Sequence, residues 1–96
     1  MAKEATFKKR LISRLVKLKV NYFVKEAVSI LGISDIIAWK RGKFIALEVK
    51  KSKSAPRTKL QELFIDKVNA DGGFGRFIYP ENFEEVIREM LIHIEK

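Results

Sequence analysis

Two neighbouring apolar runs separated by a short polar turn constrain this fold most strongly. Residues 35–40 and 43–50 are rich in β-branched and aromatic side chains, with Arg41-Gly42 between them, a pattern typical of a β-hairpin. Both faces of the hairpin are apolar. One face carries Ile36, Ala38, Ile45, Leu47 and Val49, and the other carries Ile37, Trp39, Phe44 and Ala46. A sheet that is apolar on both faces needs helices on both, so we expect a compact α/β fold.

The remaining segments supply helices and two more strands. Residues 3–18 have the spacing of a basic amphipathic helix, whose expected core stripe is Phe7, Leu11, Leu15 and Leu18. Residues 21–24 have the pattern of a short strand. A second helix follows the polar loop 51–59, ending at Gly72 or Gly73. Its expected core face is Leu60, Leu63, Phe64 and Val68.

The chain then returns as a strand at 76–79, which Pro80 ends, and closes with a third helix. Asn82 and Glu85 have the spacing of a capping box at the start of this helix. The expected order is helix, three strands, helix, strand, helix. The core face of the last helix is predicted to be Phe83, Val86, Ile87, Met90, Leu91 and Ile94.

Composition limits the size and the partners of the protein. With 96 residues, 47% of them hydrophobic, the chain has the material for one domain spanning 1–96. Its net charge of +8 favours a polyanion as partner, nucleic acid first and a membrane surface second. No signal peptide or spanning segment is recognisable, so we expect a soluble, intracellular protein. With no cysteine, a metal would be held by oxygen ligands or by His93, to which we assign no role.

Two carboxylates lie on the otherwise apolar hairpin. A two-residue turn at Arg41-Gly42 would place Asp35 directly opposite Glu48, with Cβ atoms about 4.5–5.5 Å apart. Lys50 would project from the same face, because side chains alternate along a strand. Opposed like charges destabilise a sheet, and a divalent cation between them would offset the repulsion.

Other interpretations of the two acids are open at this point. They could lie solvated at frayed strand ends, with Lys50 in an ordinary ion pair. A three-residue turn would shift the register and send the acids to opposite faces. Two further positions are ambiguous in the same way. Glu4 lies on the expected core stripe of the first helix and could be a third ligand or a solvated terminal residue, and Gln61 could reach the site or cap its helix with Thr58.

These residues resemble a known family. The run GISDIIAWKRGKFIALEVKKS, followed by TKLQELFIDKVNADGG, is similar to the VRR-NUC branch of the PD-(D/E)XK nuclease superfamily from about residue 32 to 73. Asp35 matches the family's acidic residue and Glu48-Val49-Lys50 its E-x-K element. Ser34 stands where the family usually has proline. The resemblance implies an αβββαβ core with a central mixed sheet flanked by helices, here with an additional C-terminal helix.

The resemblance also implies a function. It points to a DNA endonuclease that uses magnesium or manganese, akin to small stand-alone Holliday junction resolvases. Such proteins act as homodimers on four-way or otherwise branched DNA in recombination and repair, here in the cytoplasm of a prokaryotic or phage-infected cell. The implied metal ligands are Asp35, Glu48, the Val49 carbonyl and Glu4, with Lys50 and Gln61 completing the catalytic set. The expected DNA contacts are Lys8, Lys9, Arg10, Lys51, Lys53, Arg57 and Lys59.

Three alternatives differ in their chemistry. The chain could be a non-catalytic basic module that binds nucleic acid, with its acids in structural ion pairs. It could be a nuclease acting on flaps, nicks or linear DNA. A sequence-specific restriction-type nuclease is less favoured, because the chain has little length to spare for base-reading loops.

Overall fold

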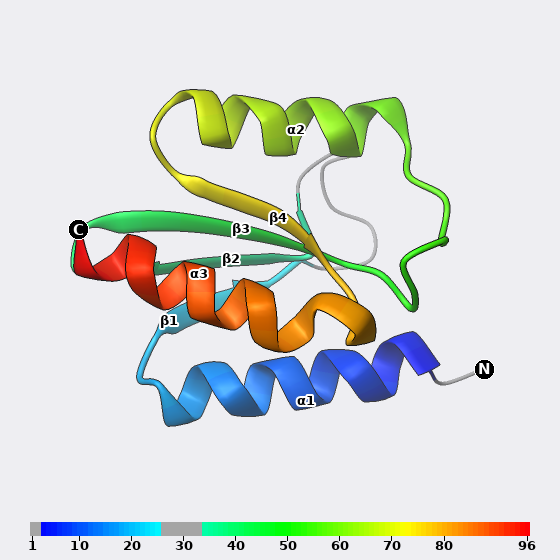
Figure 1. Cartoon of the computed structure of the whole chain (residues 1–96), viewed down its shortest axis with the longest axis horizontal. Helices are drawn as coiled ribbons and strands as arrows, with labels where there is room; N and C mark the ends of the chain where they lie inside the picture. Colours follow the sequence, from blue (N-terminus) through cyan, green and yellow to red (C-terminus); the bar gives the residue numbers. More distant parts are fainter. Residues whose placement is uncertain (1–2, 26–33) are drawn as a thin grey trace.

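A four-stranded mixed sheet with helices on both faces organises the computed structural model, which describes residues 3–25 and 34–96. The strands lie in the order β1-β2-β3-β4, and only the β3–β4 pair is parallel. Helices α1 and α3 cover one face and α2 the other (Figure 1). The elements are α1 (Lys3–Lys17), β1 (Asn21–Val24), β2 (Ile36–Lys40), β3 (Lys43–Val49), α2 (Lys59–Ala70), β4 (Phe74–Ile78), the 3₁₀ turn η1 (Pro80–Asn82) and α3 (Phe83–Glu95). The predicted order of elements is therefore confirmed.

The hairpin turn has the predicted length and fixes the register. Lys40 is opposite Lys43, with Arg41 and Gly42 between them at φ values of 54° and 80°. Two central residues with positive φ are typical of the type I′ turn, whose twist matches that of the flanking strands. The ladder continues with this register to Ile36 opposite Leu47. The three-residue turn is thereby ruled out.

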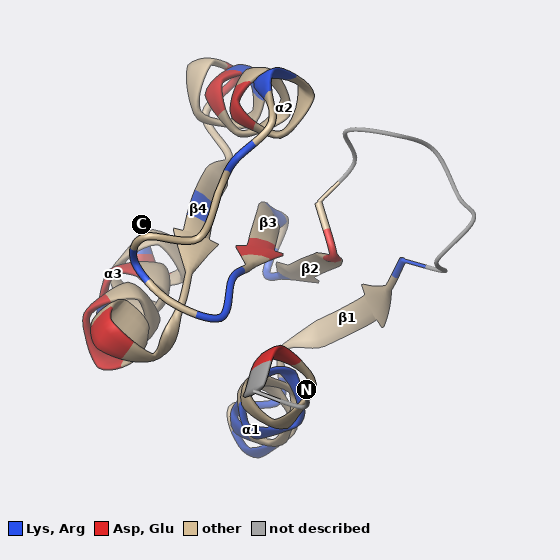
Figure 2. Cartoon of the chain, turned by 90° about the vertical axis from the view of Figure 1, so that its right-hand side faces the viewer, with Lys and Arg blue, Asp and Glu red and all other residues tan. Residues whose placement is uncertain are grey.

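The larger core lies between the sheet and the α1–α3 layer. It contains the predicted stripe of α1, the predicted face of α3 with Leu91 at its margin, and the first apolar face of the hairpin. The second face of the hairpin is only half covered. Ile37 and Ala46 are buried, but Trp39 and Phe44 are each 44% exposed. The expectation that this whole face is covered is wrong, because α2 lies over β3 and β4 rather than over the whole sheet (Figure 2).

Helix α2 presents a different side to the sheet from the one predicted. Ile65 and Val68 are buried, whereas Leu60 and Leu63 are 51% and 49% exposed. The buried stripe continues through Gln61, four residues before Ile65, since positions i and i+4 share a helix face. The polar contacts of Gln61 described below therefore lie on the packed side of the helix.

Strand β4 begins at Phe74, two residues earlier than expected. The turn between α2 and β4 is short because Gly72 adopts a φ of 90°, which glycine allows at little cost. Gly75 is part of the strand rather than of the loop. A Cβ atom there would lie 3.0 Å from the Ile65 carbonyl oxygen, so glycine permits the close approach of α2 to β4.

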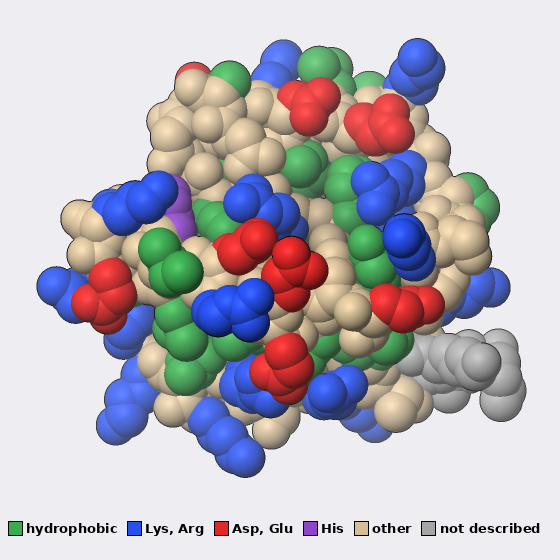
Figure 3. All heavy atoms as spheres, viewed as in Figure 1, with side chains coloured by type: hydrophobic (Ala, Val, Ile, Leu, Met, Phe, Trp, Pro, Cys, Tyr) green, Lys and Arg blue, Asp and Glu red, His purple; other side chains and the backbone are tan. Residues whose placement is uncertain are grey.

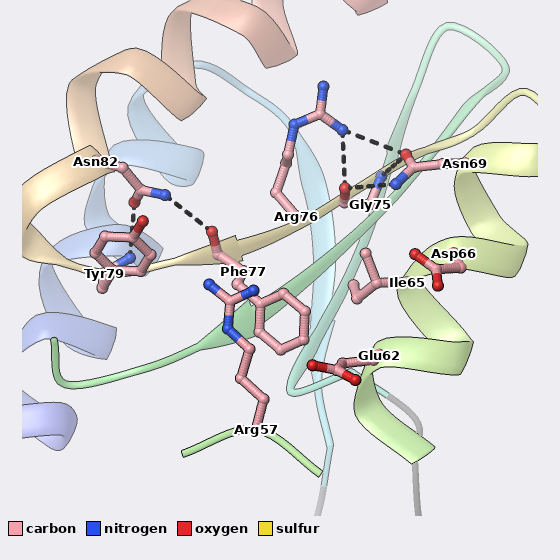
Figure 4. A pocket seen from close by; sticks show the side chains of 10 residues that line it. All are labelled: Arg57, Glu62, Ile65, Asp66, Asn69, Gly75, Arg76, Phe77, Tyr79 and Asn82. Carbon is pink, nitrogen blue, oxygen red and sulfur yellow. Dashed lines mark hydrogen bonds between the residues drawn. The ribbon is translucent and has the colours of Figure 1, made fainter. Parts of the chain in front are cut away.

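Two asparagine side chains occupy the outer edge of β4 (Figure 4). Asn69 accepts a hydrogen bond from the Gly75 N–H at 2.8 Å and donates one to the Gly75 carbonyl at 3.0 Å. Further along the same edge, the Asn82 side chain accepts a hydrogen bond from the Tyr79 N–H and donates one to the Phe77 carbonyl. The predicted capping box at Asn82 is wrong, because its side chain makes no cap hydrogen bond to α3. Instead, the two amides satisfy groups that an added strand would otherwise pair with.

Among the described residues, no helix combines the length and apolar character that crossing a membrane requires.

Candidate functional site

The predicted site residues gather at the end of the hairpin remote from its turn. Figure 2 looks onto this end, where β2 begins, β3 ends and α2 begins. The site lies on the α2 face of the sheet, since Ala46 and Ile37 on that face pack against α2 residues. Three backbone segments that are distant in sequence therefore contribute to one place.

Asp35 and Glu48 adjoin one another as the register predicts. The ladder ends at Ile36 opposite Leu47, so the next residues outward are Asp35 and Glu48. Oδ2 of Asp35 accepts a 3.0 Å hydrogen bond from the Val49 N–H. Glu48 is only 3% exposed. Glu48 is therefore not a solvated acid at a frayed strand end, whereas Asp35 is half-buried at a bend, one residue before the start of β2.

The environment of Glu48 disfavours its ionised form. Burial, the negative charge of Asp35 and a carboxyl contact with Asp35 raise the pKa of Glu48 from 4.5 to about 7, against the opposing effect of Lys50 and Lys25. Oε1 of Glu48 is buried and has no hydrogen-bond partner among the described residues. Two ionised carboxylates cannot hydrogen-bond to each other, so a proton, a bound water or a cation would have to satisfy this oxygen.

Gln61 links the acidic pair to Lys50. Its Nε2 donates to Oε2 of Glu48 at 3.0 Å, and its Oε1 accepts from Nζ of Lys50 at 3.0 Å. Nζ of Lys50 also donates to the Pro56 carbonyl at 2.8 Å. Gln61 forms a capping box with Thr58 as well, through hydrogen bonds of 2.9 and 3.1 Å. Gln61 therefore makes both predicted kinds of contact: it reaches the acidic pair and it caps its own helix.

The other two predicted metal ligands are less directly supported. Glu4 is exposed at the start of α1, which agrees with the alternative of a solvated terminal residue and not with a buried carboxylate. Within residues 3–25 and 34–96 no three acidic or imidazole side chains come close enough to hold one ion. Ligation by Glu4 and by the Val49 carbonyl stays a prediction. The residues present nevertheless fit a divalent cation, since two adjoining carboxylates leave one buried oxygen unsatisfied.

The predicted DNA-contacting residues form two separate groups. Four lie in or next to the loop that joins β3 to α2 and borders the site, and all are exposed: Lys51, Lys53, Arg57 and Lys59. Lys8, Lys9 and Arg10 lie on α1, in the layer across the sheet from the site. Figure 3 shows Lys and Arg side chains gathered over α1, with acidic side chains over α3 above them. Arg10 is partly engaged there, 3.8 Å from Glu84 and over the Phe83 ring.

Phe77 is a site neighbour that the sequence did not reveal. It is the register partner of Glu48 across the parallel β3–β4 pair, and the Arg57 guanidinium lies 4.0 Å from the centroid of its ring. Arg57 and Phe77 help to line a pocket of about 430 Å³ between α2 and the edge of β4 (Figure 4). The sequence predicted a strand after the second helix, but it did not indicate which residue of that strand would lie beside Glu48. The Pro56 carbonyl had no sequence signal at all.

Searches of protein-family models, curated proteins and solved structures each found no match to this chain.

Proposed function

We propose that this chain is a divalent-metal-dependent endonuclease that hydrolyses phosphodiester bonds in branched DNA. The observation that carries the proposal is the buried Glu48 oxygen that has no partner among residues 3–25 and 34–96, beside Asp35 and linked by Gln61 to Lys50. Placing the like charges of Asp35 and Glu48 side by side, with Glu48 buried, costs free energy. Such an unfavourable pair of carboxylates is typical of functional sites, where a bound cation offsets the repulsion.

The chain's own groups divide the chemistry between them. Asp35 and Glu48 would hold Mg²⁺ or Mn²⁺, with the Val49 carbonyl and Glu4 as further candidates. Such an ion, when bound, lowers the pKa of a coordinated water and offsets charge on a phosphate. Lys50 supplies a fixed positive charge for the extra negative charge of the transition state. Gln61 acts as a positioning residue, because it holds Glu48 and Lys50 at a set separation.

The basic loop supports nucleic acid as the substrate. The loop between β3 and α2, next to the acidic pair, carries the exposed Lys51, Lys53, Arg57 and Lys59. The whole chain has a net charge of +8. Contacts of this kind bind phosphates without reading sequence and weaken steeply with salt. The preference for four-way junctions and the homodimer rest on the family resemblance and form part of the proposal.

One specific observation favours a second candidate, a non-catalytic nucleic-acid-binding module. The described residues contain no group of three potential ligands, and a proton shared by Asp35 and Glu48 would also satisfy the buried oxygen. In that case the basic surface would act alone.

Cleavage of labelled DNA separates the two candidates. A four-way junction, a flap, a nicked duplex and a linear duplex are incubated with protein in Mg²⁺, in Mn²⁺ or in chelator. We expect junction cleavage that disappears in chelator and in Glu48→Gln while binding persists. Glu62→Gln is the matched control, because Glu62 is an exposed acid on the adjacent first turn of α2. Binding of every substrate without cleavage in either metal would overturn the nuclease and favour the binding module.

A further inference from the structure

Three large aromatic side chains lie exposed on the sheet face that carries the candidate site. Phe23 is 52% exposed, and Trp39 and Phe44 are each 44% exposed. Trp39 is directly opposite Phe44, and Phe23 is opposite Ile37, so all three belong to the face of Ile37 and Ala46. We call these three residues the aromatic face. Single exposed apolar residues are ordinary, but three on one side of neighbouring strands form a surface that favours a ligand.

The aromatic face continues along the strands into the acidic pair. Trp39 precedes the turn on β2, and Asp35 lies four residues before it on the same side. At the usual rise of a strand the two positions are about 13 Å apart. That separation equals about four nucleotides at the ~3.4 Å rise of a stacked strand.

The charge beside the aromatic face suits a polyanion. The residues between Trp39 and Phe44 are Lys40, Arg41, Gly42 and Lys43. Lys40 and Lys43 belong to the opposite face, because side chains alternate along a strand, and there they donate to the Lys19 carbonyl and to carbonyls of the last α3 turn. The cations on the side of the aromatic face are the exposed residues of the loop that borders the acidic pair, Lys51, Lys53, Arg57 and Lys59. Aromatic rings next to such cations are the usual means of holding bases and backbone together.

We propose that the aromatic face binds the unpaired bases of a DNA strand whose backbone reaches Asp35 and Glu48. This inference rests on the proposed function and narrows its substrate to DNA with a single-stranded segment next to the cut. Bases in a duplex stack on one another and present only their edges, whereas unpaired bases offer their faces to Phe23, Trp39 and Phe44. Every base has such a face, so this site would read strandedness rather than sequence.

Trp39 is the only tryptophan of the chain, and its fluorescence therefore reports on this face directly. The full-length protein is titrated with a single-stranded oligonucleotide and with the blunt duplex of the same sequence, in chelator so that nothing is cut. We expect the single strand to quench the Trp39 fluorescence. We also expect it to bind with a lower Kd than the duplex, although the duplex carries twice as many phosphates. Phe44→Leu and Phe23→Leu should each raise the Kd for the single strand about 5- to 100-fold.

Ile92→Ala is the matched control, because Ile92 is 58% exposed on α3, across the sheet from the aromatic face. Its Kd should equal that of the wild type, and circular dichroism of all variants verifies that they fold. Equal quenching by duplex and single strand, or unchanged Kd in both leucine variants, would overturn the inference. So would Trp39 fluorescence that responds to protein concentration and not to DNA, because a second copy of the chain would then occupy the face.

The result is separable from that of the cleavage assay. Quenching by single strands without any cleavage would leave the aromatic face standing and remove the nuclease. Cleavage of junctions by a protein whose leucine variants bind single strands normally would do the reverse.

Discussion

The side-chain amide of Gln61 donates a 3.0 Å hydrogen bond to Oε2 of Glu48, joining the first turn of α2 to the last part of β3. This contact stabilises one rotamer of a buried carboxylate. It also makes the position of that carboxylate depend on how the helix begins. The chemistry of the site and the local folding of α2 are therefore coupled.

Glu48 should make stability fall as the pH rises from about 4.5 to about 7. The folded protein holds this proton more tightly than the unfolded chain, since its pKa is raised from 4.5 to about 7. The stabilisation is complete below the unfolded pKa and is lost above the folded one, a difference of up to about 3 kcal/mol. Urea unfolding at several pH values measures it. The difference between wild type and Glu48→Gln should change over this range, and a constant difference would contradict the pKa shift.

A divalent cation should raise the melting temperature at pH 8, where Glu48 is ionised. Binding only to the folded state at 100 times Kd adds about 2.7 kcal/mol of stability. Differential scanning fluorimetry with Mg²⁺ or Mn²⁺ should show the shift in the wild type and in Glu62→Gln. Asp35→Asn and Glu48→Gln should lack it. The same shift in all four proteins would mean that the ion binds elsewhere.

Thr58→Ala should lower stability and cleavage together. The substitution removes the hydroxyl that accepts the Gln61 N–H, which costs about 1 kcal/mol at a helix N-terminus. Because Gln61 also holds Glu48 and Lys50, cleavage should fall while the Kd for DNA stays constant. Thr58→Ser should restore both properties. Cleavage that survives in a destabilised Thr58→Ala protein would show that the cap does not position the site.

Lys50→Met and Lys53→Met should have different effects although they remove the same charge. Lys50 bonds to Gln61 and Pro56 inside the site, so its loss should reduce the cleavage rate by about 10²-fold or more with little change in binding. Lys53 is exposed on the loop, so its loss should weaken binding and reduce the salt slope by about one. Single-turnover cleavage and anisotropy titrations at several salt concentrations distinguish the two. Identical behaviour would assign Lys50 to phosphate binding alone.

Asn69→Ala should destabilise the protein by about 1–3 kcal/mol, because the Gly75 N–H loses its acceptor and the Gly75 carbonyl keeps only its hydrogen bond from Arg76. Asp66→Ala, at an exposed position on the same helix, is the control for the helix propensity of alanine. Urea unfolding compares the two, and light scattering on heating should show earlier aggregation of Asn69→Ala. Equal stability of both variants would show that the edge contacts contribute nothing.

Local patterns predicted the parts of the fold that depend on local physics. The stripe of α1 and the face of α3 follow from helical periodicity. The register of Asp35 and Glu48 follows from a turn whose two residues both have positive φ. These features need no knowledge of what packs against them.

The incorrect predictions concern how the elements pack against each other. Leu60 and Leu63 have the same spacing as a buried pair, but the burial of a helix face depends on where the helix crosses the sheet. Trp39 and Phe44 extend the second apolar face of the hairpin, yet both are 44% exposed because α2 packs on Ile37, Ala46 and Phe77 instead. Phe77 adjoins Glu48 only because β4 pairs with β3 in parallel. Such relationships are set by tertiary structure, which sequence spacing does not encode.

The asparagine amides on β4 have a consequence for larger assemblies. They occupy the backbone groups along one margin of the sheet, so a dimer built by continuing the sheet would have to join its subunits past β1. The two β4 strands would then lie at the outer ends of one shared sheet. Both acidic centres would lie inward of those ends, on either side of the dyad, at a spacing set by the β1 and β2 strands of the two subunits.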